Sequence, residues 1–198
     1  LRVTESLNPE QIGHIPKVLY HWRMIPGSTA TAAAEKSYAH VAGLRSVQEH
    51  LDRSGRGAVV RETTGSGYFK IEHPLPDPSP LVSILIPTRD RIDLLRQCID
   101  SILDKTEYPA YEIIIIDNDS QEEASKRYFE QVQRDSRVSV LSYKHPFNYS
   151  AINNAGAAVA NGSVFALLNN DIEVISKQWL NEMAAHALRP EVGVVGAM

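Results

Sequence analysis

Short runs of apolar and β-branched residues recur at intervals of about 25 to 30 residues downstream of residue 80. Between them, apolar residues fall at the three- and four-residue spacing of a helix. The runs are nearly continuous in apolar residues, which is typical of strands buried on both faces of a parallel sheet. This alternation predicts an α/β doubly wound fold, a mostly parallel sheet flanked by helices. The predicted strands are Leu81–Ile86, Glu112–Ile116, Val138–Tyr143, Val164–Leu168 and Gly193–Val195, and the predicted helices are Asp93–Lys105, Glu122–Arg134, Ser150–Ala160 and Trp179–Leu188.

Residues 1–75 have a different character, and they predict a small α+β segment. We expect a strand at Lys17–Trp22, a helix at Thr31–Ser54, and a hairpin formed by Ala58–Arg61 and Tyr68–Ile71. This is too little to hold a core of its own. Four prolines within residues 72–80 restrict the backbone and predict a linker at 76–80, so the second domain is expected to span 81–198.

Composition indicates a globular protein with a core, because 43% of the residues are hydrophobic and 22% are charged. A formal charge of −4 without a basic stripe argues against nucleic-acid binding. No apolar stretch approaches the roughly 18 residues of a transmembrane helix. The single cysteine, Cys98, cannot form an internal disulfide, and the first residues lack the order of a signal peptide, so we predict a cytoplasmic setting.

Polar clusters follow three of the predicted strands: 87–91, 117–120 and 169–173. In doubly wound sheets, ligands bind beyond the carboxyl ends of the strands. Asp, Asn and Ser are also common in turns and helix caps, so one such cluster has a purely structural alternative. Three of them at one sheet edge favour a ligand site.

Asp171 is the candidate metal ligand in the third cluster. Mg²⁺ and Mn²⁺ take oxygen ligands, and often only one or two protein carboxylates together with phosphate oxygens. Glu173 would share a face with Asp171 if the strand continued, although a solvated charge is an equal alternative. The sequence contains neither the G-x-x-x-x-G-K-[ST] phosphate loop nor the zinc motif H-E-x-x-H.

The motifs in this half of the chain, in their order and spacing, resemble those of family 2 glycosyltransferases with the GT-A fold. The resemblance spans residues 81–198 and implies the Rossmann-like, donor-binding half of that fold. It is carried by Val82–Arg91, Tyr111–Ser120, Phe147–Asn154, Leu167–Val174, Trp179–Leu180 and Arg189–Gly196.

The resemblance implies inverting transfer of a sugar from a UDP-, GDP- or dTDP-linked donor to a glycan or lipid-linked acceptor. Asp171 would bind Mn²⁺ or Mg²⁺, because the run from residue 169 stands at the family's D-x-D position. Asn169 removes one charge from that motif, which predicts weak metal affinity. The other implied nucleotide-sugar contacts are Pro87, Thr88, Asp90, Asp117, Asn118, Asn154, Asn169 and Asn170.

The family places its acceptor site and general base in a second half of the domain, which would follow Met198. We therefore expect a fragment that is inactive alone, with an apolar edge that favours dimers. Residues 18–29 resemble the end of another GT-A domain, where His21, Arg23 and Ser28 would contact a donor diphosphate. These features resemble a bacterial polysaccharide or lipopolysaccharide glycosyltransferase with tandem domains, cytoplasmic or peripheral at the inner face of the membrane. Alternatively, residues 1–75 only extend the second domain.

Two other functions fit parts of the pattern. A non-catalytic nucleotide-binding or scaffolding module is compatible with Asn169 and with the lack of an evident general base. A nucleotidyltransferase shares the sheet and its acidic edge. Against the nucleotidyltransferase, the expected glycine- and lysine-rich loop after the first strand is replaced by Thr88–Arg89–Asp90.

Overall fold

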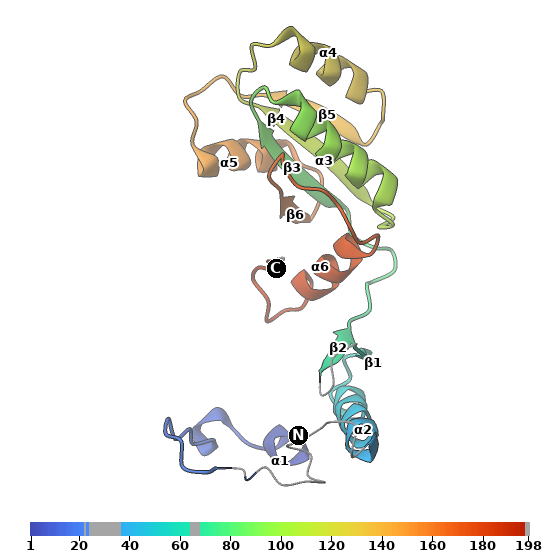
Figure 1. Ribbon diagram of the computed structural model, residues 1–198, viewed down its shortest axis with the longest axis vertical. Coiled ribbons are helices and arrows are strands. Elements are labelled where there is room, and N and C mark those ends of the chain that lie inside the picture. Colours follow the sequence, from blue (N-terminus) through green and yellow to red (C-terminus); the bar gives the residue numbers. More distant parts are fainter. Residues whose placement is uncertain (22, 24–36, 64–67, 197–198) are drawn as a thin grey trace. The chain divides into compact units, whose positions relative to one another are not determined.

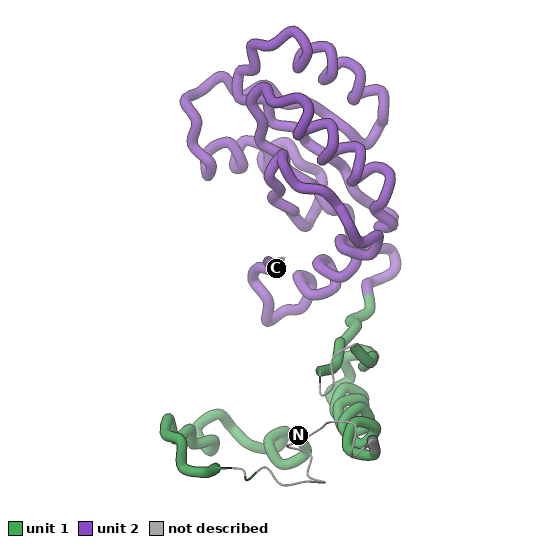
Figure 2. Tube along the Cα trace, in the orientation of Figure 1, with its two compact units in different colours: residues 1–74 green, residues 75–198 purple. Residues whose placement is uncertain are grey.

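The computed structural model describes residues 1–21, 23, 37–63 and 68–196. The chain divides into two compact units, residues 1–74 and residues 75–198 (Figure 2). The proline-rich segment at 76–80 belongs to the second unit. Leu75 packs against the core of that unit, and the Tyr108 hydroxyl donates a hydrogen bond to the Pro80 carbonyl at 2.7 Å.

The second unit is built on a four-stranded parallel sheet with the order β5-β4-β3-β6 (Figure 1). Its register places Leu85 of β3 beside Ile114 of β4 on one side and Leu167 of β6 on the other. The chain therefore adds two strands on one side of β3 and then returns to add β6 on the opposite side. The strands are β3 (Val82–Thr88), β4 (Tyr111–Asp117), β5 (Val138–Ser142) and β6 (Val164–Leu167).

Helices cover both faces of this sheet because successive strand side chains point to opposite faces. Ile84 and Ile113 lie on the face that packs against α3, α4 and α6, whereas Leu85 and Ile114 lie on the other face with Ile152 of α5. All five side chains are buried. The helices are α3 (Ile92–Lys105), α4 (Glu123–Val132), α5 (Tyr149–Val159) and α6 (Trp179–Ala187).

The predicted α/β fold is confirmed, and so are the first four strands and all four helices of this unit, with ends that differ by one or two residues. The predicted strand at Gly193–Val195 is wrong. Residues 193–196 form no strand, and Val194 is 88% exposed. A strand is stabilised by pairing, and the described sheet places no neighbour beside this segment.

The first unit contains a long helix and a hairpin. Its elements are α1 (Arg2–Glu5), the 3₁₀ turn η1 (Pro9–Gln11), α2 (Ser37–Arg53), β1 (Val59–Glu62) and β2 (Phe69–Glu72). The Gln48 side chain joins α2 to the hairpin, because it donates to the Ala58 carbonyl at 3.1 Å and accepts from the Val60 N–H at 2.9 Å. Leu51 and Ala58 are the buried hydrophobic residues of the described part of this unit.

The predicted helix and hairpin of the first unit are confirmed within the described residues, and residues 31–36 and 64–67 lie outside them. The predicted strand at Lys17–Trp22 is wrong for its described part, residues 17–21, which form no strand. Val18, Leu19 and Tyr20 are all exposed. β-branched and aromatic residues favour a strand only where they can pack against a neighbour.

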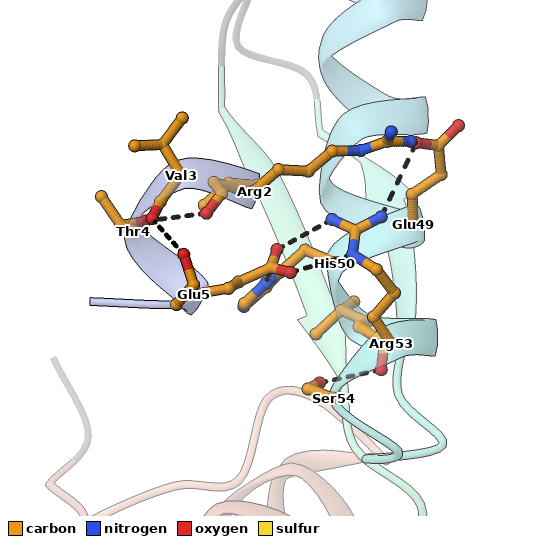
Figure 3. Close-up of polar contacts among 11 residues, drawn as sticks. Arg2, Val3, Thr4, Glu5, Glu49, His50, Arg53 and Ser54 are labelled. Carbon is orange, nitrogen blue, oxygen red and sulfur yellow. Dashed lines mark hydrogen bonds and ion pairs between the residues drawn. The ribbon is translucent and has the colours of Figure 1, made fainter. Parts of the chain in front are cut away.

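An ionic cluster ties α1 to α2 (Figure 3). The Glu5 carboxylate accepts hydrogen bonds from Arg53 Nε and Nη2 at 2.9 and 2.8 Å, and lies 2.7 Å from His50 Nδ1. Beside it, Arg2 Nη2 pairs with Glu49 Oε2 at 2.6 Å. The hydrogen bonds from Arg53 and then His50 lower the pKa of Glu5 to about 2. This cluster thus connects segments that are more than 40 residues apart.

Candidate functional site

The strand order of the sheet reverses between β3 and β6, and such a switch point opens a crevice at the carboxyl ends of the strands. A cavity of about 230 Å³ lies there. Pro87, Thr88 and Arg89 line it from the end of β3, and Asn169 and Asn170 line it from the segment after β6. Together with Asn118, which follows β4, they bring all three polar clusters predicted from the sequence to one cavity.

The rest of the cavity wall comes from β4 and from the start of α5. Asn118 follows β4, Phe147 precedes α5, and Tyr149 and Ile152 belong to α5. Asn118 and Ile152 are buried, whereas Phe147 and Tyr149 are exposed. The cavity thus has an amide-rich side and an aromatic side.

Asn118 is held in place by hydrogen bonds from its side-chain amide and its backbone. Its Nδ2 donates to the carbonyls of Tyr143 and His145 at 3.0 and 2.8 Å. Its backbone N–H donates to the Thr88 carbonyl at 2.8 Å. Asn118 therefore fixes the loop after β5 and leaves only its Oδ1 atom, an acceptor, for a ligand in the cavity.

Asp90 and Asp117 stabilise the loops after β3 and β4 by hydrogen bonds to backbone groups. Oδ1 of Asp90 accepts the backbone N–H groups of Gln121 and Glu122, both at 2.9 Å, and the Asp90 N–H donates to the Ser120 hydroxyl at 2.8 Å. Asp117, half-buried at the end of β4, accepts the Ser120 N–H on Oδ1 at 2.9 Å and closes a turn. The φ of Asp90, 52°, lies in the left-handed region, which Asp and Asn tolerate better than most residues. Neither carboxylate lines the cavity, and their contacts with the base and ribose stay predictions.

We expect Asp90→Ala to lower the free energy of unfolding by about 1 to 2 kcal/mol, because two N–H groups lose their acceptor and alanine disfavours the left-handed backbone. Asp90→Asn is the matched control, since it keeps both the acceptor oxygen and the tolerance for this φ. Urea unfolding of the two variants measures the difference. Equal stability of the alanine and asparagine variants would contradict a clamping role for Asp90.

The clusters after β3 and β6 are linked directly. Asn170 Nδ2 donates to Thr88 Oγ1 at 3.0 Å, and the Asn169 carbonyl lies 3.7 Å from the Cys98 sulfur. Cys98 is buried in the core, as predicted. Burial and then the negative charge of Asp171 raise the pKa of the Cys98 thiol to about 12.

Asp171 lies in an exposed turn after β6, and its carboxylate takes part in no hydrogen bond or ion pair among the described residues. Those residues also contain no group of three or more His, Cys, Asp or Glu side chains that could hold a metal ion. A single carboxylate can hold a hard cation only where water and phosphate oxygens of a ligand complete the shell. Asp171 would be that carboxylate; it does not line the cavity, and its binding of Mn²⁺ or Mg²⁺ stays a prediction.

Glu173 does not line the cavity. The strand ends at Leu167, so the expectation that Glu173 shares a strand face with Asp171 is wrong. Its carboxylate instead accepts hydrogen bonds from Lys105 Nζ and Gln97 Nε2, both at 2.9 Å, on α3. The hydrogen bond from Lys105, and to a lesser extent that from Gln97, lowers the pKa of Glu173.

We expect Glu173→Gln to leave nucleotide and metal binding at the wild-type level, because this side chain is engaged with α3. The lowered pKa means that the ion pair with Lys105 is present at neutral pH and is lost as the pH falls through that pKa. Calorimetric titration measures the binding, and a side-chain NMR titration measures the pKa. A large loss of metal-dependent affinity in this variant would show that Glu173 takes part in metal or nucleotide binding.

The remaining predicted contacts lie elsewhere. Asn154 is exposed on α5 and does not line the cavity, whereas its neighbour Asn153 is buried and donates to the Tyr149 carbonyl at 2.8 Å. His21 and Arg23 are exposed residues of the first unit, and Ser28 lies outside the described residues. Their predicted contact with a second donor diphosphate stays a prediction.

Sequence reasoning missed four lining residues: Arg89, Phe147, Tyr149 and Ile152. Arg89 stands between predicted contacts, so its position already pointed to the cavity. Phe147 and Tyr149 belong to a motif that carried the resemblance, but the pattern does not distinguish an exposed aromatic residue from a core one. Ile152 lies on the apolar face of α5 and gave no signal beyond packing.

The fold of the second unit is that of the GT-A glycosyltransferases. The structure is similar to the mannosyltransferase PcManGT from Pyrobaculum calidifontis, which was solved in complex with GDP-Man and Mn²⁺. The TM-score is 0.54 at 17% sequence identity, over 81% of this chain and 44% of that chain. The chain belongs to glycosyl transferase family 2, whose family model matches residues 83–198. The resemblance predicted from the sequence is thereby confirmed.

Two longer proteins match almost the whole chain. The uncharacterized protein y4gI of Sinorhizobium fredii is 45% identical over 207 aligned positions, which cover 100% of this chain and 22% of that protein. The O-antigen biosynthesis protein RfbC of Myxococcus xanthus is 41% identical over 99% of this chain and 15% of its own length. The chain thus spans only 22% and 15% of the lengths of these two relatives. Within the described residues, no helix is long and apolar enough to cross a membrane.

Proposed function

We propose that residues 81–198 form the nucleotide-sugar-binding half of an inverting glycosyltransferase. The donor would be a UDP-, GDP- or dTDP-linked sugar, and the acceptor a glycan or lipid-linked glycan in cell-surface polysaccharide synthesis. The observation that carries this proposal is the cavity at the switch point, where Asn170 donates a hydrogen bond to Thr88 and where all three polar clusters meet. Asp171 does not line the cavity but directly follows Asn170 in the chain. The identity with RfbC, named for O-antigen biosynthesis, supports the polysaccharide pathway.

The residues in and beside this cavity fall into two groups by their chemistry. Asn118 and Asp117, at the end of β4, offer acceptor oxygens to N–H and O–H groups of a base and ribose. Asp171 would hold Mn²⁺ or Mg²⁺ against the diphosphate, and Arg89 would add a planar cation on the β3 side. A bound cation would supply neutralisation of the charge that develops on the departing diphosphate.

Inversion at the sugar carbon needs a general base to take the proton of the acceptor hydroxyl. The Glu173 carboxylate is engaged with Lys105, and neither Glu173 nor Glu182 of α6 lines the cavity. We therefore propose that this chain binds and orients the donor, that the base belongs to another part of the full-length enzyme, and that the chain alone is inactive.

Residues 1–75 would be the tail of a preceding glycosyltransferase domain. The protein would act in the cytoplasm or at the inner face of the membrane.

One edge of the sheet in the second unit is apolar. In the described sheet, β6 is an edge strand, and its Phe165 and Leu167 are about half exposed. An apolar edge of this kind supports the expected tendency to dimerise.

Calorimetric titration with uridine, guanosine and deoxythymidine diphosphates, each with and without Mn²⁺, tests the proposed function. We expect one base to bind more tightly than the others. We also expect the affinity to rise when Mn²⁺ is present, because an ion held by Asp171 would neutralise charge on the diphosphate. Adenosine diphosphate is the control for a nucleotide outside the proposed donor class. No binding of any of the three nucleotides would contradict a donor site in this chain.

A further inference from the structure

We propose that Phe147 and Tyr149, the aromatic pair, hold the nucleobase of the donor by stacking. This inference rests on the proposed function and adds a site that the predicted contacts do not include. Both side chains line the cavity, and they are 68% and 46% exposed. Large aromatic side chains are usually more buried than this, since burial of their surface is favourable.

The backbone that carries the aromatic pair is fixed by the start of α5. Asn148 caps this helix, because its Oδ1 accepts the Ala151 N–H at 3.0 Å, and Phe147 and Tyr149 stand on either side of the cap. The Tyr149 carbonyl is held by the hydrogen bond from Asn153. The rings are thus presented from a fixed helix start, which lowers the entropic cost of ordering them on a ligand.

The surroundings of the aromatic pair match the shape and polarity of a base. Pro87 and Ile152 add apolar surface to the wall, and Asn118 contributes an acceptor to the same cavity. A nucleobase has an apolar π-face and a polar edge, so it satisfies both kinds of surface at once. A phosphate group gains nothing from the rings. The aromatic pair therefore marks the base end of the site, and Asp171 marks the diphosphate end.

The inference is tested with two probes, a nucleoside diphosphate and inorganic pyrophosphate, both titrated in the presence of Mn²⁺. Stacking of one base on one aromatic ring is worth enough that Phe147→Ala is expected to weaken nucleoside diphosphate binding about 5- to 150-fold. Pyrophosphate has no base, so its affinity is expected to stay unchanged. Tyr149→Ala is expected to act in the same direction, and Phe147→Trp to retain the wild-type affinity.

Phe165→Ala is the matched control, because Phe165 is 49% exposed on β6 but does not line the cavity. Its affinity for both probes is expected to equal that of the wild type. Unchanged nucleoside diphosphate binding in both alanine variants of the aromatic pair would overturn the stacking and leave the proposed function intact. Equal losses for the nucleotide and for pyrophosphate would also overturn it, since they indicate a structural effect. A wild-type chain that binds no nucleotide would overturn the proposed function and the stacking together.

Discussion

Asp171→Ala is expected to remove the metal dependence of nucleotide binding and to lower the affinity for a nucleoside diphosphate in Mn²⁺ at least about 100-fold. Loss of an outer-shell partner of a metal ligand already costs about 10- to 100-fold, and Asp171 is the carboxylate proposed to contact the ion itself. The described residues offer no cluster of ligands that could replace it. The affinity without metal is expected to change little, because no other described side chain depends on this carboxylate for a hydrogen bond.

Asp171→Asn separates charge from shape in this experiment, because it keeps a ligand oxygen and removes the negative charge. We expect its affinity for a nucleoside diphosphate in Mn²⁺ to lie between those of the wild type and the alanine variant. Glu173→Gln, two residues away, removes a carboxylate that is turned towards α3 and is the control for a general change in local charge. If Asp171→Ala bound the nucleotide as the wild type does in Mn²⁺, the metal site would have to lie elsewhere.

Gly162→Ala is expected to cost about 3 kcal/mol of unfolding free energy or more, the upper range for added atoms in a packed core. A Cβ atom on Gly162 would lie 2.7 Å from both the Leu81 carbonyl oxygen and the Ser83 nitrogen, and 2.6 Å from the Ser83 hydroxyl. Two of these are backbone atoms at the start of β3, which pairs with β4 and β6 and cannot shift freely. Relief of the clash would displace β6 and the cluster that follows it.

Alanine substitutions at two other glycines are the controls for the loss of stability in Gly162→Ala. Gly193→Ala is expected to change stability little, because a Cβ there meets no atom within 4 Å. Gly156→Ala is expected to cost less than Gly162→Ala, because the close atom, at 2.4 Å, is the terminal carbon of the Ile116 side chain, which can move. Urea unfolding compares the three variants. A Gly162→Ala protein as stable as Gly193→Ala would show that β3 and β6 are not held as tightly as described.

The sheet of the second unit could be predicted from the sequence because its determinants are local. Val82–Ile86 and Ile113–Ile116 are short, nearly continuous apolar runs, which are typical of strands buried on both faces, and the helix between them repeats with a different period. The positions after β3 and β6 followed from the same reasoning, since parallel strands end at one edge. Gly193–Val195 failed because apolar character alone does not supply a pairing partner.

Side-chain partners from distant parts of the chain could not be predicted. Glu173 is drawn to Lys105, 68 residues away, and Asp90 binds N–H groups about 30 residues away. Each contact depends on how α3 and α4 are placed on the sheet, which no local pattern records. For the same reason, the aromatic pair was recognisable as part of a motif but not as the wall of a cavity.

Paramagnetic broadening of backbone amide NMR signals by Mn²⁺, in the presence of a bound nucleoside diphosphate, tests the central claim most directly, because it reports where the ion lies. The account predicts that the signals of residues 169–172 and 88–90 broaden first, and that Mg²⁺ restores them. Broadening centred on another part of the chain, with these residues unaffected, would contradict a donor site at the switch point between β3 and β6.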